Sequence, residues 1–593
     1  MNSSDQKVRD IVESYFGQEL QAHFLEQLET RLLQGGEWLF RKGDPGHSLY
    51  FLIRGRLRVW SGSGDPDSED TRLLGEVVPG DSVGEVGLLS GKPRSAGIQA
   101  IRDSLLVRID RTDFENLAEQ HPALVIRLAA NVGRILQEGA TGSSAASRSL
   151  KTITLLPLHE SGHVGHYCKQ FSQALAEQGS MLALSADGLA ALGAPVVECP
   201  PVGELPENLR HWLSDQEDEH DYVLYLCSSG DSAWSRFAIR QSDIVLKIAD
   251  AGKGPGSIEW EPDAESSDTK FVGRKALILL QEDRYNITHT RDWLDGRRQD
   301  FHLQMEKGCL KDVKRAVRIV NGTATGLIIG GGAARGLSAL GVFKSLVEHG
   351  VEIDWVGGTS IGSIMAGAIA TNWKPDEAID ACRKAFMDGK PFGDFTIPVV
   401  SLLRGRRMRR LLSVHLDFQI EDLGLPYFCV STNLGRGTKN IHEKGSLVRA
   451  IRASAALPGV MPPVVIDGEL AIDGAIVNNL PVDIMQQKPV GKIIAVDFTA
   501  PVPSKVDYTE LPSPWAILRG RWLPFARRYR VPGISSLILK ATEAGTQDDV
   551  RKFGAMADLL IDPQVRQFGM TDVKSFDQIV AAGYERANEL LSD

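Results

Sequence analysis

A serine with the spacing of a hydrolase nucleophile lies in the second half of the chain. Residues 357–363 read "GGTSIGS", and this Gly-x-Ser-x-Gly pattern places Ser360 on a sharp strand-to-helix turn that exposes its Oγ. A serine hydroxyl reacts well only when a neighbouring base removes its proton. In the α/β-hydrolase order that base would be a histidine after the acid, yet the last histidine of the chain is His442. The chain therefore needs a base of another type.

A glycine loop precedes this serine. Gly330, Gly331 and Gly332 follow the strand-like run "TGLII" and come before an amphipathic helix. A dinucleotide-binding loop would require one more glycine where Arg335 stands, so that interpretation fails by one position. Backbone N–H groups of such a loop can instead stabilise the oxyanion of an acyl-transfer intermediate. We therefore expect Gly330, Gly331 and Gly332 to form an oxyanion hole.

The elements around both motifs are predicted from their periodicity. The helix after the glycine loop should face the core through Leu337, Leu340 and Val347 and end at Gly350. The serine should follow the strand "IDWVGG", and the next helix, "IGSIMAGAIA", consists largely of small residues that allow close packing. Both motifs thus fall between a strand and a helix, which makes the pair more specific than Gly-x-Ser-x-Gly alone.

An aspartate further along the chain can supply the missing base. In residues 468–485, "GELAIDGAIVNNLPVDIM", Asp473 ends a short apolar strand and precedes a Gly-Ala turn that projects its carboxylate. It could be a turn residue with no chemical role. A partly desolvated aspartate beside Ser360 would instead gain basicity and take the serine proton directly. We predict a Ser360–Asp473 dyad in which His415 and His442 play no part.

Two patterns in the middle of the chain resemble functional motifs but lack their context. Residues 159–163, "HESGH", have the H-E-x-x-H spacing of a zinc site. They directly follow a strand-like run and include Ser161 and Gly162, so we expect a strand-to-helix loop and no metal. Residues 251–257, "AGKGPGS", lack the Gly-Lys-Ser/Thr ending of a phosphate loop. We interpret this region as a structural α/β layer with the parallel strands "YVLYLC", "DIVLKIA" and "KALILLQ".

A possible ligand site lies near the N-terminus. In "GEVGLLSGKPRSAGIQA", residues 84–100, Glu85 can accept a hydrogen bond from a ribose 2′-hydroxyl and Arg94 can pair with a cyclic phosphate. Short apolar runs alternate with turns at Gly43 and Gly55, which predicts an antiparallel β-roll over residues from about 20 to 112. The alternative is a roll that kept its shape and lost its ligand.

These residues resemble the phosphate-binding cassette of cyclic-nucleotide-binding domains. The matching positions are Gly84, Glu85, Arg94 and Ser95, and the likeness extends over residues from about 20 to 137. It implies cyclic AMP or cyclic GMP as an effector. The chemistry proposed for Ser360 requires no cofactor and no metal.

The C-terminal motifs resemble those of the patatin-like phospholipases, lipid acyl hydrolases with a Ser-Asp dyad. Residues 330–336 match their oxyanion motif, residues 358–362 their nucleophile elbow and residues 473–475 their Asp-Gly-Gly/Ala motif. Together with the N-terminal cassette they resemble the neuropathy target esterase branch, whose members act on phospholipids and especially lysophospholipids. "DWLDGRRQDFHLQ", "SAALPGVMPPV" and "VNNLPVDIM" are also similar to that branch. Unlike the animal relatives, this sequence shows a single evident cassette and no transmembrane N-terminus. We therefore do not infer the relatives' membrane anchoring or their regulation for this chain.

Composition limits the partners and the compartment. With 593 residues, 42% hydrophobic, and a net charge of −10, the chain is an ordinary globular protein and is not expected to bind nucleic acid. Its six cysteines form no C-x-x-C pair, which favours reduced thiols. The polar start "MNSSDQKVRD" is unlike a signal peptide. We expect a cytoplasmic protein that can attach peripherally to the inner face of the membrane.

Two arginine-rich tracts favour contact with a lipid surface. They are "SLLRGRRMRRLL" at 401–412 and "WAILRGRWLPFARRYR" at 515–530. Each arginine near an anionic surface contributes about 1 kcal/mol, and Trp515, Trp522 and Phe525 suit the headgroup level. The alternative is a pair of ordinary amphipathic helices with solvated basic faces.

The expected organisation is multidomain. We expect a cyclic-nucleotide-binding β-roll with flanking helices over 1–138, a linker at 139–150, a middle α/β domain at 151–320 and a patatin-like α/β hydrolase at 321–593. Two functions fit: a serine hydrolase of phospholipids or lysophospholipids regulated by a cyclic nucleotide, or a nucleotide sensor whose inactive hydrolase domain is an interaction surface. The intact dyad and glycine loop favour the first. The sequence leaves open the headgroup, the role of the middle domain and whether the chain forms a homodimer.

Overall fold

The computed structural model describes most of the chain. The described residues are 29–62, 71–120, 126, 133, 150–195, 207–258, 260–261, 273–285, 287, 289–498, 509–522, 550–569 and 572–592. They belong to two compact units: the first comprises Met1–Ala324 with Gln486–Gly491, and the second comprises Thr325–Met485 with Lys492–Asp593. The linker expected at 139–150 and the helix expected at 122–137 lie outside the described residues, apart from positions 126, 133 and 150.

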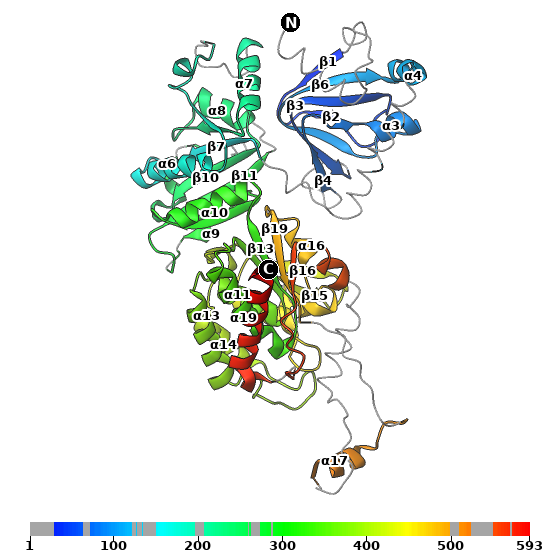
Figure 1. Cartoon of the computed structure of the whole chain (residues 1–593), viewed down its shortest axis with the longest axis vertical. Helices are drawn as coiled ribbons and strands as arrows, with labels where there is room; N and C mark the ends of the chain where they lie inside the picture. The colour runs from blue at the N-terminus through cyan, green and yellow to red at the C-terminus, as the bar shows by residue number, and fades with distance from the viewer. Residues whose placement is uncertain are drawn as a thin grey trace. The chain divides into compact units, whose positions relative to one another are not determined.

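The first unit begins with an antiparallel β-roll, as the alternation of apolar runs and glycine turns predicts (Figure 1). Its strands are β1 (Glu29–Leu33), β2 (Trp38–Phe40), β3 (Ser48–Ser61), β4 (Arg72–Val77), β5 (Ser82–Val83) and β6 (Gly97–Asp110), with helices α3 (Glu85–Ser90) and α4 (Arg111–Gln120). The order is β1-β6-β3-β4, with β2 beside β6 and β5 beside β3. Gly43 and Gly55 have φ of 93° and 101°, which a residue with a side chain rarely adopts.

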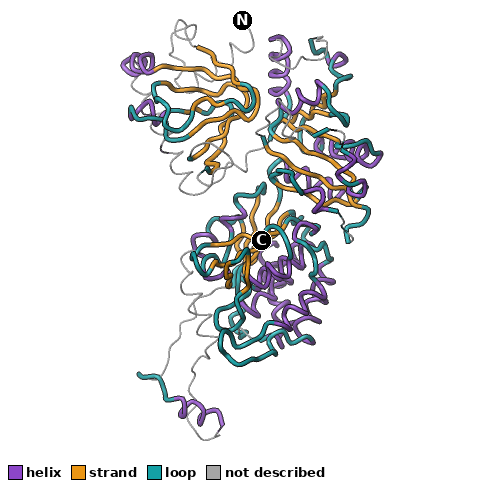
Figure 2. Tube along the Cα trace, turned by 180° about the vertical axis from the view of Figure 1, so that it is seen from behind, coloured by secondary structure: helices purple, strands orange, loops and turns teal. Residues whose placement is uncertain are grey.

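The same unit contains a parallel sheet with helices packed along it (Figure 2). Its strands are β7 (Thr152–Pro157), β8 (Met181–Ser185), β9 (Tyr222–Leu226), β10 (Ile244–Asp250), β11 (Arg274–Gln281) and β12 (Phe301–Glu306), in the order β12-β11-β10-β7-β9-β8. The helices are α6 (Gly162–Ala176), α7 (Glu207–Glu219), α8 (Ala233–Arg240), α9 (Thr290–Leu294) and α10 (Leu310–Val320). The three parallel strands expected in this region are confirmed.

The "HESGH" motif is a loop at its start, as its context predicts. Strand β7 ends at Pro157 and helix α6 begins at Gly162, so residues 159–161 connect a strand to a helix. The buried His159 accepts a hydrogen bond from the backbone N–H of Asp250 at Nε2, 3.1 Å away. Its Nδ1 lies 3.3 Å from the Ser257 hydroxyl. Both ring nitrogens of His159 therefore have partners within the fold.

The second unit is built on a mixed sheet of parallel and antiparallel strands. Its strands are β13 (Thr325–Ile329), β14 (Trp355–Thr359), β15 (Tyr427–Asn433), β16 (Lys439–His442), β17 (Val464–Ile466), β18 (Glu469–Asp473), β19 (Lys492–Val496) and β20 (Leu559–Ile561). The order is β17-β18-β15-β14-β13-β19-β20, with β16 beside β15. Strands β13, β14, β15, β19 and β20 are parallel, whereas β16, β17 and β18 pair antiparallel.

Most of the helices of this unit lie next to the sheet (Figure 1). The helices are α11 (Ser338–Glu348), α12 (Ile361–Ala370), α13 (Pro375–Arg383), α14 (Arg406–His415), α15 (Leu447–Ser454), α16 (Val482–Met485), α17 (Pro514–Trp522) and α19 (Phe576–Ser592). Helices α11 and α19 approach so closely that a Cβ at Gly341 would lie 1.9 Å from the Val580 carbonyl oxygen. Glycine at this position therefore permits the crossing.

One core prediction for helix α11 is wrong. Leu337 and Leu340 are buried as expected, although Leu337 belongs to a short 3-10 turn, η5 (Ala333–Leu337), before the helix. Val347 is 38% exposed. Phe343 and Leu346 continue the buried stripe from Leu340 in steps of three, which turns position 347 away from the core.

Two further features of the described residues are the length of their helices and the state of their cysteines. In these ranges no helix combines the length and the apolar character needed to cross a bilayer. The five cysteines found there are free thiols; Cys382 and Cys429 are buried and Cys168, Cys227 and Cys309 are half-buried.

Candidate active site

Ser360 stands alone between a strand and a helix, as predicted. Strand β14 ends at Thr359 and helix α12 begins at Ile361, and Ser360 has φ 55° and ψ −122°. A positive φ in a residue with a side chain is strained, and such strain persists where the surrounding packing enforces it. Cβ atoms at Gly358 and Gly362 would lie 2.5 Å from the Gly362 carbonyl carbon and 2.1 Å from the Ile329 oxygen. The two glycines of the pattern thus allow the chain to turn sharply at Ser360.

The structure brings Asp473 to this serine. The Ser360 hydroxyl donates a hydrogen bond to Asp473 Oδ2, with 2.8 Å between the oxygens. The backbone N–H of Ala475, in the turn after β18, donates to the other carboxylate oxygen at 2.9 Å. Because both carboxylate oxygens have a donor, the side chain is held with one oxygen directed at the serine.

Burial tunes the basicity of this carboxylate. Asp473 is 1% exposed, and this desolvation raises its pKa to about 6, although the bonds from Ala475 and Ser360 act in the opposite direction. The group is therefore ionised at neutral pH while being a stronger base than an ordinary aspartate. This is the protonation behaviour that a general base requires.

The glycine loop lies against the serine, but its N–H groups are not equivalent. Gly330 donates to the Val496 carbonyl oxygen at 3.0 Å and Gly331 donates to the Asn479 carbonyl oxygen at 3.2 Å. Among the described residues, the Gly332 N–H has no hydrogen-bond partner. Two of the three predicted oxyanion donors, the N–H groups of Gly330 and Gly331, are thus already hydrogen-bonded. The Gly330 bond continues the pairing of β13 with β19. Gly332 is the free donor.

Two polar residues support the site without having been assigned a role from the sequence. Ser454, at the end of α15, accepts a hydrogen bond from the Ser360 N–H at 2.9 Å. Asn479 Oδ1 accepts from the Gly331 N–H at 3.1 Å. Both lie in stretches recognised as similar to the esterase branch, "SAALPGVMPPV" and "VNNLPVDIM". The signal available in the sequence was that both residues lie within these two stretches.

The histidines named from the sequence make other contacts. His442 is buried, with Nε2 2.7 Å from the Ser431 hydroxyl, and burial lowers its pKa. His415 lies on α14 and lines a cavity. In the described ranges neither histidine is hydrogen-bonded to Ser360 or Asp473.

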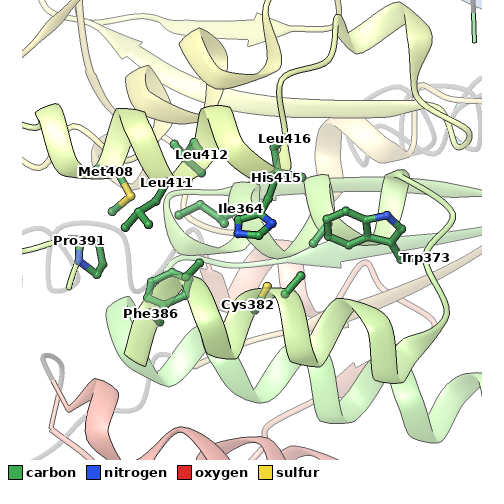
Figure 3. Close-up of a pocket in the computed structure, with 13 residues that line it drawn as sticks. Ile364, Trp373, Cys382, Phe386, Pro391, Met408, Leu411, Leu412, His415 and Leu416 are labelled. Atoms are coloured by element: carbon green, nitrogen blue, oxygen red, sulfur yellow. The ribbon is translucent and has the colours of Figure 1, made fainter. Parts of the chain in front are cut away.

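An apolar cavity of about 30 Å³ lies beside the nucleophile helix (Figure 3). Ile364 of α12 lies between side chains of α14 on one side, including Met408 and Leu412, and Phe386 on the other. Phe386 belongs to a short π-helical turn, η6 (Lys384–Asp388), and such turns often occur at functional sites. The lining is almost entirely apolar.

The N-terminal cassette brings its predicted residues together in a different way. The Arg94 guanidinium donates to the Gly84 carbonyl oxygen at 3.0 Å and to the Ser48 carbonyl oxygen at 2.7 Å, and it stacks 4.0 Å from the Phe40 ring centre. Glu85 is buried and accepts from the Ser82 hydroxyl, and burial raises its pKa. The predicted Ser95 is exposed.

One polar atom of the cassette lacks a partner. Arg94 Nε is buried and forms no hydrogen bond. A buried guanidinium N–H without an acceptor fits an anionic group at this position. The residues present are therefore compatible with a cyclic phosphate. Among the described residues, no cluster of His, Cys, Asp and Glu could hold a metal ion.

Comparisons with known proteins agree with this domain order. Family models match the cyclic nucleotide-binding domain over residues 30–121, the neuropathy target esterase family P-loop like domain over 149–326 and patatin-like phospholipase over 327–485. The three matches follow the β-roll, the parallel sheet and the sheet that carries Ser360. The chain therefore contains all three domain types.

Curated relatives match nearly the whole chain. Lysophospholipase NTE1 of Candida albicans is 29% identical over 95% of this chain and 46% of its own length. Patatin-like phospholipase domain-containing protein 7 of Mus musculus is 30% identical over 95% of this chain and 45% of its own. Protein 6 of the same series, from Homo sapiens, is 29% identical over 95% and 44%. The chain thus spans a little under half the length of these relatives.

A solved structure matches part of the first unit. The regulatory domain of Toxoplasma gondii PKA with cAMP is 22% identical, covers 20% of this chain and 45% of that chain, and has a TM-score of 0.18. In chain order, the matches are to a cyclic nucleotide-binding domain, a neuropathy target esterase family P-loop like domain and a patatin-like phospholipase domain, and the curated relatives are similar to this chain over most of its length.

Proposed function

We propose that this protein hydrolyses the acyl ester of phospholipids, and of lysophospholipids in particular, with Ser360 as nucleophile and Asp473 as general base. The observation that carries the proposal is the 2.8 Å hydrogen bond between the Ser360 hydroxyl and the buried Asp473 carboxylate. The names of the matched relatives include lysophospholipase and patatin-like phospholipase, which supports this class of substrate.

The reaction proceeds through an acyl-enzyme. Asp473 accepts the hydroxyl proton as Ser360 Oγ bonds to the ester carbonyl carbon, and the carbonyl oxygen becomes an oxyanion. The free N–H of Gly332 donates a hydrogen bond to that oxygen. The bond to the glycerol oxygen then breaks, and the proton on Asp473 passes to this leaving oxygen. Acyl-enzyme and glycerol product result.

Water completes the cycle with the same groups. Asp473 takes a proton from water as the water oxygen attacks the acyl carbon, and Gly332 again faces the oxyanion. The bond to Ser360 Oγ breaks, the serine regains its proton from Asp473, and a fatty acid is released. A single carboxylate therefore serves as base and acid in both halves, as its pKa of about 6 permits.

We propose that a cyclic nucleotide regulates this activity through the first unit. Arg94 would hold the phosphate through its unpartnered Nε, and Glu85 would accept from the ribose 2′-hydroxyl. Within this unit, Arg102 of the roll pairs with Glu217 at 2.8 Å and Asp243 at 2.9 Å in the parallel-sheet region. These buried ion pairs give a physical route by which a change in the roll could reach the middle domain.

We also propose that the protein is cytoplasmic and attaches peripherally to the inner face of the membrane. The free thiols of the described cysteines suit a reducing compartment. The second half of the arginine tract at 401–412 belongs to helix α14, which has an exposed basic face. In the second tract, Trp515 on α17 is exposed, and residues 523–530 lie outside the described ranges.

The proposal is tested with the purified full chain. Release of fatty acid from lysophosphatidylcholine and of p-nitrophenol from a short ester should be measured with and without cyclic AMP or cyclic GMP. A fluorophosphonate should label Ser360, located by peptide mass spectrometry. Absence of turnover on every acyl ester, with the nucleotide still bound, would instead indicate a sensor with an inactive hydrolase domain.

A further inference from the structure

A short hairpin projects from the second unit just before the arginine-rich helix α14. Its base is closed by an antiparallel bridge between Phe395 and Leu403 and by the bond from the Arg404 N–H to the Asp394 carbonyl oxygen at 2.9 Å. At its tip the Val399 N–H donates to the Ile397 carbonyl oxygen at 2.8 Å, so the chain reverses around Pro398. Residues 394–404 form this hairpin, which has a defined conformation.

The hairpin exposes apolar side chains. Ile397 is 81% exposed, Val399 85%, Val400 65% and Phe395 70%. Single exposed apolar residues are common on protein surfaces, but four within six positions form a contiguous patch. Such patches mark binding surfaces for proteins or membranes.

The hairpin is joined to the active site through one short segment. Leu402 and Leu403 donate backbone hydrogen bonds to the carbonyl oxygens of Gly459 and Val460, at 2.9 and 3.0 Å. The residues just before this segment contact the hydrogen-bonded pair itself: Ser454 accepts from Ser360, and the Ala456 carbonyl accepts from the Asp473 N–H at 3.0 Å. The hairpin is therefore connected to Ser360 and Asp473 through residues 454–460.

Unneutralised arginines follow the hairpin directly. Met408 and Leu412 are the buried side of α14. The exposed guanidinium groups around them are Arg404, Arg406, Arg407, Arg409 and Arg410. Within the described ranges none of these five forms an ion pair. Residues 384–417 contain seven basic and three acidic side chains, in a chain with a net charge of −10.

The positive charge extends onto the neighbouring helix α15. The half-buried Arg452 has its pKa lowered by burial and by the like charges of Arg409 and Arg449. No acidic group is among those that act on Arg452. The three arginines repel one another, and an anion that binds between them would stabilise all three. Phosphate groups of lipids supply such anions.

We propose that the hairpin tip and the arginines of α14 form a surface that docks the enzyme on an anionic phospholipid bilayer. The apolar tip enters the interface while the arginines bind lipid phosphates, the two contributions that together give stable peripheral binding. A bilayer is favoured over a protein partner because exposed apolar and basic groups are adjacent and because the cavity beside the nucleophile shares α14. This inference rests on the proposed lipid hydrolase function.

The test is sedimentation of the full chain with vesicles. Phosphatidylcholine vesicles are compared with vesicles in which about a third of the lipid is phosphatidylserine, at low and high salt. Wild-type protein should bind the anionic vesicles far better, and added salt should weaken this binding. Ile397→Asp with Val399→Asp should weaken it about tenfold or more, since two carboxylates would have to enter the interface.

Matched controls separate this surface from general effects of charge. Leu192→Asp with Leu310→Asp makes the same change at exposed apolar positions of the first unit and should leave vesicle binding unchanged. Arg406→Gln, Arg407→Gln and Arg410→Gln combined should reduce binding on the order of a hundredfold. Neutralising three ion-paired arginines, the exposed Arg566 and the half-buried Arg236 and Arg586, alters the net charge equally and should change binding little.

Enzyme assays distinguish failure of docking from failure of the hydrolase. The hairpin and arginine variants should hydrolyse a soluble p-nitrophenyl ester at the wild-type rate and lose activity on vesicle-borne lysophospholipid in parallel with binding. Wild-type protein that hydrolyses the soluble ester but ignores the vesicles would overturn the docking surface alone. Equal losses in hairpin and control variants would also overturn it, as would self-association that is abolished by Ile397→Asp. Vesicle binding without any ester hydrolysis would overturn the hydrolase and leave the docking surface standing.

Discussion

The serine site and the nucleotide cassette show two ways of holding reactive side chains. At the serine site the two groups are directed at each other: the Ser360 hydroxyl remains partly accessible and donates to a buried carboxylate. In the cassette, Arg94 and Glu85 are buried and bonded to their own surroundings, Arg94 to backbone oxygens and Glu85 to Ser82. The side chains of the serine site are therefore already directed at each other before a ligand binds.

This difference has energetic consequences. In the proposed mechanism the substrate binds to a Ser360–Asp473 pair that is already hydrogen-bonded, so substitutions there should remove activity with little effect on folding. A cyclic nucleotide would have to add to, or compete with, the bonds that Arg94 already makes. Substitutions in the cassette should therefore change folding stability as well as binding. The predictions below test this contrast.

The largest effect is expected at the dyad. Ser360→Ala and Asp473→Asn should each lower kcat for lysophosphatidylcholine by about 10⁴-fold or more, because each removes an indispensable member of a unit. Thermal unfolding should show that Ser360→Ala remains as stable as the wild type. His415→Gln and His442→Gln serve as controls and should retain kcat within about threefold. A histidine variant that is folded but as inactive as Ser360→Ala would refute the dyad.

The glycine loop should give the next largest effect. A Cβ at Gly332 would lie 2.6 Å from the Phe498 Cβ, so Gly332→Ala should displace the one free donor of the loop. Losing such a donor usually lowers kcat by about 100- to 1000-fold. Steady-state kinetics should show the loss in kcat with a smaller change in KM. Gly435→Ala, where a Cβ would make only an ordinary contact of 3.6 Å with Asn433 Oδ1, is a control for the general effect of replacing a glycine in this unit. Equal activity of both variants would argue against an oxyanion donor at position 332.

How far the sequence predicts the site depends on whether the contacts are local. Gly-x-Ser-x-Gly encodes the turn at Ser360 within five residues, and Asp473 ends its own strand, so both could be placed from local pattern. The occupation of the Gly330 and Gly331 N–H groups depends on Val496 and Asn479, which lie about 150 residues away. No spacing rule reveals such a tertiary contact.

The same limit explains the surface features. The run "FTIPVV" before α14 has the composition of a buried strand, and only the hairpin geometry places its side chains in solvent. The cassette motif likewise identified Arg94 and Glu85 but not their existing partners Ser48 and Ser82. The local sequence thus identified the residues of interest, whereas their exposure to solvent and their partners could be known only from the folded structure.

The cassette should show a smaller effect on activity than the dyad. Arg94→Ala should abolish cyclic-nucleotide binding measured by calorimetry and should also lower the unfolding temperature, because Phe40, Gly84 and Ser48 lose a buried partner. Any nucleotide effect on lipid hydrolysis should lie within the roughly 5- to 150-fold range usual for coupled sites and vanish in this variant. Arg111→Ala, which removes a half-buried arginine bonded to the Leu88 carbonyl, is a control for stability alone. Wild-type protein that binds neither nucleotide would show that the cassette has lost its ligand.

The smallest effect is a gradual pH dependence in which activity and stability change in opposite directions. Burial raises the pKa of Asp473 to about 6, and the dyad needs the ionised form, so kcat/KM should fall about tenfold per pH unit below that value.

The folded pKa of Asp473 exceeds that of the unfolded chain, so the protonated carboxyl stabilises the fold at low pH and this contribution is lost as pH rises through about 6. The shift of roughly two units corresponds to at most about 3 kcal/mol. Asp473→Asn cannot ionise, so its stability relative to the wild type should increase between about pH 4 and pH 7, the range that spans the unfolded and folded pKa values and in which the wild type gains activity. Denaturant titrations of both proteins across this range, beside the wild-type rate profile, measure the two trends. A rate profile that is flat through pH 6, or a stability difference independent of pH, would show that Asp473 is not the titrating base.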